Sequence, residues 1–120
     1  MRKIEREMLA AFVSGETLAK GNTTVSHDPV IGGWESEVRL HGHLIAKRYV
    51  NGELEINLCG YNTDTTRSRL SALIRGLAAS GAAASYPSGL GVSSRKGVIR
   101  LHDARGETII DAHGWHKVEF

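Results

Sequence analysis

The sequence contains a single cysteine, Cys59, among 120 residues. A lone cysteine cannot form an internal disulfide and excludes a zinc module built on several cysteines, so a reducing compartment such as the cytoplasm is expected. Long hydrophobic runs are also absent, and no window approaches the roughly 20 apolar residues that cross a bilayer. Glutamates interrupt the first residues, MRKIEREMLAAFV, so we expect neither a signal peptide nor a membrane anchor there.

Charge of one sign does not dominate the chain. The 15 lysines and arginines against 13 aspartates and glutamates leave a net charge of +2, so nucleic-acid binding would have to depend on local clusters of cations. The sequence contains no paired catalytic carboxylates, nucleophile elbow, phosphate-binding P-loop or dinucleotide fingerprint. We therefore predict a protein that is not an enzyme and needs no cofactor.

Four histidines and the cysteine are the candidates for metal or thiol chemistry. His41 and His43 would share one face of a continuous strand, and His113 and His116 could add further imidazoles to a zinc site. A tight turn at His41 would make the first two rings diverge, and no carboxylate partner for them is identifiable. Cys59 is expected in a packed hairpin, which predicts an inert thiol. We expect no metal site.

The remaining features predict one α+β domain that spans residues 1–120. This length is typical of a single domain with its own core, and 14 glycines indicate many turns between short strands. Apolar residues at helical spacing predict two helices, at about 3–14 and about 64–79, with Gly81 as the C-cap of the second. The order of helix, strands, helix and strands predicts an antiparallel sheet of short strands and hairpins, with the helices on one face.

The clearest strand signal is the run KRYVNGELEINL. The pair Asn51-Gly52 is favoured in two-residue type I′ turns, because both central residues need a positive φ. Counting outward from that turn places Arg48 opposite Glu55 as an ion pair on the solvated face, and it gathers apolar residues on the other face. The members of that apolar face would be Ile45, Tyr49, Leu54, Ile56 and Leu58.

Further turn signals divide the rest of the chain. His41-Gly42 marks either a second tight turn or a bulge in one long strand, and we favour the turn. The stretch HDPVIGGW is expected to break a strand that begins at Asn22 and to place Trp34 as a core anchor. Three or four C-terminal strands are predicted, and the tract from Gly81 to Gly91 is predicted to be a mobile loop. The reversal points of those strands would be Lys96-Gly97, Arg105-Gly106 and His113-Gly114.

The stretch GYNTDTTRSRL, residues 60–70, is the main candidate site. It would join a strand to the N-terminus of the second helix, where unpaired backbone amides and the helix dipole attract anions. Arg67 and Arg69 would lie near opposite edges of the apolar stripe and flank this helix end. Alternatively, Thr63 or Asp64 only caps the helix, both arginines pack along the fold, and the Asp64 carboxylate repels a phosphate. The sequence leaves both interpretations open.

Arg95 and Lys96 stand beside a predicted turn and would extend the candidate site if the fold brings them next to the junction. A basic stripe of that kind would bind phosphate backbones with salt-dependent affinity. The alternative is that these cations only solvate a turn. The candidate residues for binding nucleic acid or a phosphate-bearing ligand are therefore Asn62, Thr63, Thr66, Arg67 and Arg69, with Arg95 and Lys96 in support.

Several segments together resemble a family of small proteins encoded by tailed bacteriophages. They are GNTTV, VRLHGHLIA, GYNTDTTRSRLSALI, SSRKGVIRL and HGWHKV, and they span nearly the whole chain. The most specific is an Asn-Thr-x-Thr-Thr-Arg-Ser-Arg-Leu block, matched from Asn62 to Leu70, although Tyr61 and Asp64 stand where that family commonly has tryptophan and proline. The resemblance implies a phage protein in the cytoplasm of an infected bacterium, and it implies no particular activity.

Two functions follow as hypotheses. In the first, a non-enzymatic protein binds nucleic acid or a phosphate-bearing ligand through the junction at residues 61–69. In the second, the protein binds and inhibits a bacterial host protein through a hydrophobic surface or a sheet edge. Neither hypothesis involves a membrane, and neither fixes an oligomeric state.

Overall fold

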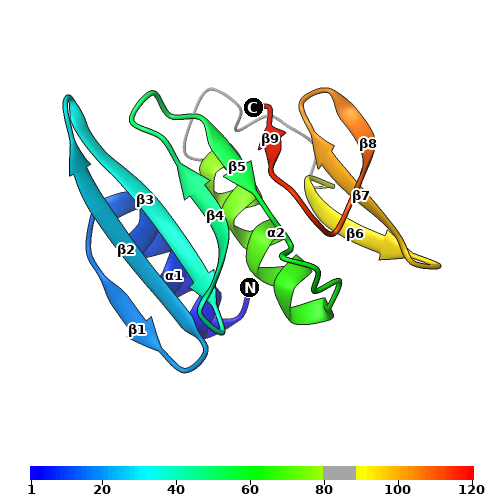
Figure 1. The fold of residues 1–120 in the computed structure, drawn as a ribbon, viewed down its shortest axis with the longest axis horizontal. Coiled ribbons are helices and arrows are strands. Elements are labelled where there is room, and N and C mark those ends of the chain that lie inside the picture. Colours follow the sequence, from blue (N-terminus) through cyan, green and yellow to red (C-terminus); the bar gives the residue numbers. More distant parts are fainter. Residues whose placement is uncertain (80–88) are drawn as a thin grey trace.

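The computed structural model describes residues 1–79 and 89–120, and it confirms the α+β class (Figure 1). Both predicted helices are confirmed, as α1, Lys3–Ser14, and α2, Asp64–Ala79. The predicted C-cap Gly81 lies outside the described residues. The strands are β1, Leu18–Lys20; β2, Thr23–Val30; β3, Gly33–Leu40; β4, His43–Arg48; β5, Leu54–Ile56; β6, Gly91–Arg95; β7, Val98–Asp103; β8, Gly106–Ile110; and β9, His116–Val118.

The described strands form two antiparallel sheets, whereas the sequence had indicated one. The larger sheet has the order β1-β2-β3-β4-β5-β9, and the smaller has the order β6-β7-β8. Neighbours in both sheets follow one another along the chain, except that β9 returns to the larger sheet and pairs with β5, with His116 opposite Ile56. Pairing between such distant segments leaves no local pattern in the sequence.

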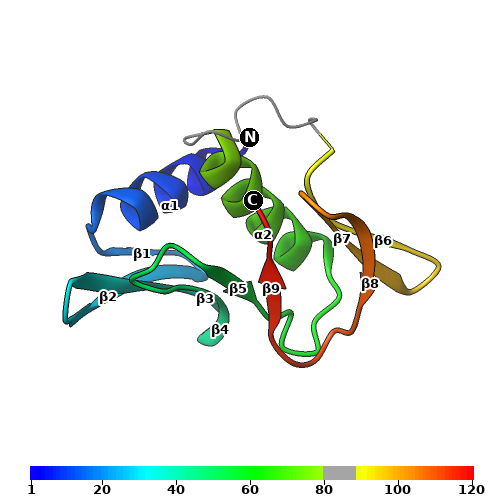
Figure 2. The ribbon, with the colours of Figure 1, turned by 90° about the horizontal axis from the view of Figure 1, so that it is seen from above.

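Both helices lie on one face of the larger sheet, and α2 also borders the smaller sheet (Figure 2). Met8 and Phe12 of α1 are buried in the core, and burial of such a side chain contributes about 1.5–3 kcal/mol. The two helices approach closely because Gly76 has no side chain: a Cβ there would lie 2.2 Å from Leu9 Cδ2. Within the described part of the chain, no helix has the length and apolar character needed to cross a membrane.

Strand β2 does not break at Pro29, contrary to the prediction from HDPVIGGW. It continues to Val30 and pairs with β3 along its whole length, with Pro29 opposite Trp34. Proline is tolerated there because β1 pairs only with Thr23–Val25, so no strand that the structure describes lies beside Pro29 on the outer side of β2. The predicted role of Trp34 as a core anchor is also wrong, since its side chain is 49% exposed.

The β3–β4 connection contains both features considered at His41-Gly42. His41 and Gly42 have φ values of 52° and 80°, as a two-residue turn between paired Leu40 and His43 requires, so the favoured turn is present. The register then shifts between Val38 and Arg39, which pair with Ala46 and Leu44. The extra residue, Ile45, is a bulge that explains the change of apolar parity.

The β4–β5 hairpin forms at the predicted place but in a different register. Asn51 does not adopt a positive φ; its Oδ1 accepts a hydrogen bond from the Glu53 amide at 3.0 Å, and only Gly52 is left-handed, at 89°. The loop therefore has three residues, and every cross-strand pair moves by one position. Lys47, and not Arg48, lies opposite Glu55, so the predicted Arg48–Glu55 ion pair does not form.

The C-terminal region contains four strands, in agreement with the prediction of three or four. Lys96 and Gly97 form the β6–β7 turn, with φ values of 53° and 78°, and the chain reverses again before Gly106. The predicted loop from Gly81 to Gly91 lies mostly outside the described residues, and its last residue, Gly91, begins β6.

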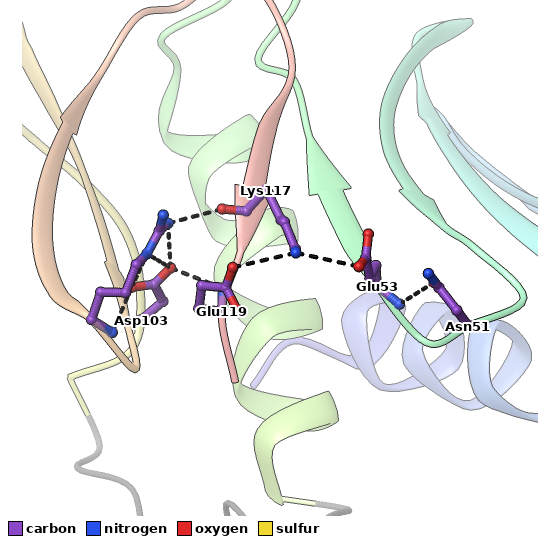
Figure 3. Close-up of polar contacts among 6 residues, drawn as sticks. Asn51, Glu53, Asp103, Lys117 and Glu119 are labelled. Atoms are coloured by element: carbon purple, nitrogen blue, oxygen red, sulfur yellow. Dashed lines mark hydrogen bonds and ion pairs between the residues drawn. The ribbon is translucent and has the colours of Figure 1, made fainter.

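A polar clamp holds the C-terminal residues against the smaller sheet (Figure 3). The Asp103 carboxylate at the end of β7 accepts hydrogen bonds from the Glu119 amide at 2.9 Å and from Arg105 Nη2 at 2.8 Å. Burial raises the pKa of the Asp103 carboxyl, but these hydrogen bonds and the charge of Arg105 outweigh burial, so the net pKa lies below its ordinary value. We call Asp103, Arg105 and Glu119 the C-terminal clamp. Lys117 of β9 bridges Glu119 and Glu53, which follows the β4–β5 loop.

Candidate functional site

Thr63 caps the N-terminus of α2, as one of the two sequence interpretations proposed. The Thr66 amide donates to Thr63 Oγ1 at 3.2 Å, and the Arg67 amide donates to the Thr63 carbonyl at 3.0 Å. The hydroxyl oxygens of Thr63 and Thr66 are 2.9 Å apart. Threonine at this position satisfies helix amides that would otherwise lack a partner.

Arg67 is engaged within the junction itself. Its Nη1 donates to Asn62 Oδ1, and its Nη2 donates to Asp64 Oδ1. The Asp64 side chain is 92% exposed, so this ion pair lies at the surface. Both ends of the guanidinium are therefore occupied, and a ligand that used Arg67 would have to compete with Asn62 and Asp64.

Arg69 lies in the interior, and its guanidinium does not reach the helix end. It forms an ion pair with Glu5 of α1 at 2.8 Å, with the two side chains only 5% and 4% exposed, and its Nε donates to Thr23 Oγ1 at 3.2 Å. Ser68 Oγ donates to Glu5 Oε2 at 2.6 Å. Burial raises the pKa of Glu5. The hydrogen bonds from Ser68 and Arg69 and the nearby arginine charges lower it by more, so the net pKa lies below the ordinary 4.5. Arg69 connects α2 to α1 and β2.

The structure brings the β6–β7 hairpin next to the junction. Asn62 Nδ2 donates to Ser94 Oγ at 2.9 Å, and Arg95 and Lys96 follow Ser94 directly. Both cations are exposed, and neither forms a hydrogen bond or an ion pair with any residue that the structure describes. Of the seven predicted site residues, six therefore belong to the junction and the adjoining hairpin, and Arg69 is the exception.

A pocket of about 430 Å³ opens beside the cap of α2. We call it the junction pocket. It joins the β3–β4 turn and β4 to the segment after β5 and the first turn of α2, and the described residues of its lining include no carboxylate. Asp64 instead lines a separate cavity with Arg67 and Arg75. The lining residues are Leu40, His41, His43, Ile45, Leu58, Tyr61, Thr63, Thr65 and Thr66.

Two aromatic rings stand together in this lining. The centroids of His43 and Tyr61 are 5.0 Å apart with planes tilted by 40°, and Tyr61 is 50% exposed. The turn at His41-Gly42 sets His43 at the start of β4, and the segment after β5 carries Tyr61 toward it. An exposed ring pair of this kind can stack against a flat, uncharged group of a ligand.

Sequence reasoning did not find this pair. It considered His41 and His43 only as metal ligands, and Tyr61 only as a departure from a family pattern. The tight turn at His41 was the available signal, because it separates the two histidines and brings β4 back beside β3. Tyr61 lies in the segment between β5 and α2, and its contact with His43 of β4 joins residues that are too far apart in sequence for a local pattern to predict.

The remaining candidates for chemistry are explained by packing. Cys59 Sγ lies 3.1 Å from the Leu44 carbonyl oxygen, and burial raises the pKa of its thiol, which disfavours the reactive thiolate. Over residues 1–79 and 89–120, no group of three or more histidine, cysteine, aspartate or glutamate side chains is placed to hold a metal ion.

The fold and the pocket define a small α+β protein, and comparison with known families places it among bacteriophage proteins. The family model described as Kyanoviridae Gp96 protein matches residues 1–99, so the chain belongs to the Kyanoviridae Gp96 family. The match includes the junction pocket, whereas the C-terminal clamp lies beyond it. No curated protein and no solved structure matches the chain.

Proposed function

We propose that this phage protein binds single-stranded nucleic acid, without catalysis, in the cytoplasm of the infected bacterium. A base would occupy the junction pocket and stack on Tyr61 and His43, while the neighbouring phosphates would run along the β6–β7 hairpin. The observation that carries the proposal is the exposed ring pair at a pocket whose described lining residues include no carboxylate.

The pocket suits an uncharged, flat group better than a bare phosphate. Its walls combine apolar side chains with the hydroxyls of Thr63, Thr65 and Thr66, which can donate to or accept from the edge of a base or a sugar. Stacking of a base on an aromatic side chain contributes about 1–3 kcal/mol and tolerates any base, because every base has a π face.

The charged part of the ligand would meet Arg95 and Lys96. These side chains are exposed and have no carboxylate partner among the described residues, so a phosphate would not have to displace an existing ion pair. The Asn62–Ser94 hydrogen bond fixes β6 to the junction, and Arg95 and Lys96 follow Ser94 directly along the chain. Arg67 would contribute less, because Asn62 and Asp64 already occupy it.

Fluorescence anisotropy with labelled single-stranded DNA and RNA, measured at about 50 and about 200 mM salt, tests the proposal. The wild-type protein should bind more weakly at the higher salt concentration. Tyr61→Ala should weaken binding about tenfold through lost stacking. Arg95→Ala should also weaken binding and reduce the salt slope by about one, as expected for one lost phosphate contact.

Arg48→Ala is the matched control, since it also removes a cation without an ion pair among the described residues, at the opposite end of the molecule. It should leave nucleic-acid binding unchanged. Equal loss in Arg48→Ala and Arg95→Ala would mean that only net charge matters, and an unaffected Tyr61→Ala would remove the stacking site. Stronger binding to a duplex or to a free nucleotide than to the single strands would reject this ligand class.

A further inference from the structure

Apolar side chains are exposed at the tips of two neighbouring hairpins. Ile31, in the β2–β3 turn, is 100% exposed, and Trp34 of β3 is 49% exposed. Val50 of the β4–β5 loop and Val13 of the adjoining helix α1 are each 47% exposed. The tips are in contact, because a Cβ on Gly33 would lie 3.4 Å from Val50 Cγ2. We call Val13, Ile31, Trp34 and Val50 the tip patch. Exposed apolar residues that cluster in this way are typical of interaction sites.

A groove of about 320 Å³ is lined by three members of the tip patch, Val13, Trp34 and Val50. Phe12 and Trp34 supply aromatic surface, and three glycines at the two turns keep the approach open. The hairpin tips lie at one end of the molecule in Figure 1, and the groove shares no lining residue with the junction pocket. Its lining residues are Phe12, Val13, Gly32, Gly33, Trp34, Ser36, Arg48, Tyr49, Val50 and Gly52.

Among the described residues that line the groove, Arg48 is the one that carries a charge. Its cross-strand neighbours are Ser36 and Leu54, and it has no hydrogen bond or ion pair with any described residue. Lys47, one position earlier and on the opposite face, pairs with Glu35 at 3.5 Å. Strand alternation thus places the neighbouring carboxylates with Lys47 and leaves Arg48 beside apolar side chains.

We propose that the tip patch docks a protein segment that presents a bulky apolar side chain next to a carboxylate. The groove has the size for one or two side chains, and a half-buried arginine favours a planar carboxylate that it can bind through two N–H groups. A membrane surface or a nucleic-acid backbone would require several cations, and Arg48 is the one cation among the described residues of this lining. The proposed docking does not depend on ligand binding at the junction pocket.

The test uses Trp34 as the reporter. Trp115 is the only other tryptophan, so Trp34 is the sole one in a Trp115→Phe background. The probes are synthetic Gly-Ser peptides that contain Leu-Asp, Leu-Asn or Leu-Lys at the centre. Leu-Asp should shift Trp34 emission to shorter wavelength, Leu-Asn should bind about fivefold more weakly, and Leu-Lys should bind least. Arg48→Glu should reverse this order.

Arg95→Ala provides the matched control and should keep the wild-type order of peptides. Equal affinity for Leu-Asp and Leu-Lys, or no emission shift with any peptide at about 1 mM, would overturn the proposal. A shift of Trp34 emission with anionic phosphatidylglycerol vesicles alone would also overturn it. The same holds for an emission shift that appears as the protein concentration rises and is accompanied by dimers in sedimentation. If Trp115→Phe does not fold, anisotropy of fluorescein-labelled peptides with the unaltered chain gives the same comparison.

Discussion

The two ends of the molecule use their side chains in opposite ways. At the junction end, polar groups satisfy one another: Thr63 caps α2, Arg67 binds Asn62, and Arg69 is buried against Glu5. At the tip end, apolar side chains are exposed, and Arg48 has no hydrogen bond or ion pair with a described residue. The difference shows that residue type alone does not assign a role, because here polar residues stabilise the fold and apolar residues remain available for contact.

The energetic reason is the cost of leaving a buried polar group without its partner. Replacing one member of a buried ion pair leaves the other charge desolvated, whereas replacing an apolar side chain that is already in water removes little. Substitution of the paired polar residues at the junction end should therefore lower the stability of the fold, whereas substitution of the exposed residues of the tip patch should affect only binding. The following variants test this contrast.

Arg69→Ala should have the largest effect. It leaves Glu5 buried without its cation and should lower the free energy of unfolding by about 3–5 kcal/mol, measured by urea denaturation. Arg67→Ala is the matched control from the same helix and should cost less than about 1 kcal/mol, because its partner Asp64 is exposed.

Equal effects of the two arginine substitutions would contradict the contrast between a buried and a surface role. A double replacement, Glu5→Met with Arg69→Met, separates lost charge pairing from lost packing. It should recover most of the stability lost in Arg69→Ala, because no uncompensated charge remains.

Asp103→Asn extends the contrast to the C-terminal clamp. Loss of the charged acceptor of the Arg105 and Glu119 hydrogen bonds should cost about 2 kcal/mol at neutral pH. The folded-state pKa of Asp103 lies below the ordinary 3.8, so its contribution is present above that pH and is lost as the pH falls through the folded value. The pKa of Glu5 is also lowered, so its contribution to stability is likewise lost as the pH falls.

Urea unfolding at neutral and at acidic pH measures this dependence. The Asp103→Asn variant should lose less stability on acidification than the wild type, because it lacks one of the carboxyl groups whose pKa is lowered in the folded state. Glu53→Gln is the control: it breaks the Lys117–Glu53 pair, which is 46% exposed on both sides, and should cost less than about 0.5 kcal/mol. An unchanged acid dependence in Asp103→Asn would show that other groups govern it.

The parts of the fold that the sequence predicted correctly depend on local patterns. Leu70, Leu73 and Leu77 recur at helical spacing, and both helices formed with the predicted bounds. The predicted β4–β5 register was wrong because Asn51 does not adopt the positive φ that a two-residue type I′ turn requires. Its Oδ1 accepts a hydrogen bond from the Glu53 amide within a three-residue loop. The return of β9 to β5 depends on packing between remote segments.

The same limit applies to the candidate site. Capping at Thr63 was predictable, because the cap and the amides it satisfies lie within four residues. The partner of Arg69 lies 64 residues away, and the Asn62–Ser94 bond spans 32 residues. Helical spacing placed Arg69 at the edge of an apolar stripe, but it could not show that α1 supplies a carboxylate there.

Thr63→Ala should have an intermediate effect. Removing the cap leaves the Thr66 amide without its acceptor and should cost about 1 kcal/mol, measured by thermal or urea unfolding. Thr65→Ala is the matched control: Thr65 lines the same pocket, and its side chain has no hydrogen bond to the described residues. A larger cost for Thr65→Ala than for Thr63→Ala would contradict the assignment of the cap.

Ile31→Ser should have the smallest effect on folding. Because Ile31 is fully exposed, the expected change in the free energy of unfolding is less than about 0.5 kcal/mol. Phe12→Ala, a buried residue in the adjoining groove, should cost about 3–5 kcal/mol. A cost for Ile31→Ser similar to that of Thr63→Ala would mean that the tip stabilises the fold. A neutral variant that also weakens binding of the Leu-Asp peptide would separate binding from folding at this end, since no loss of stability could then explain the weaker binding.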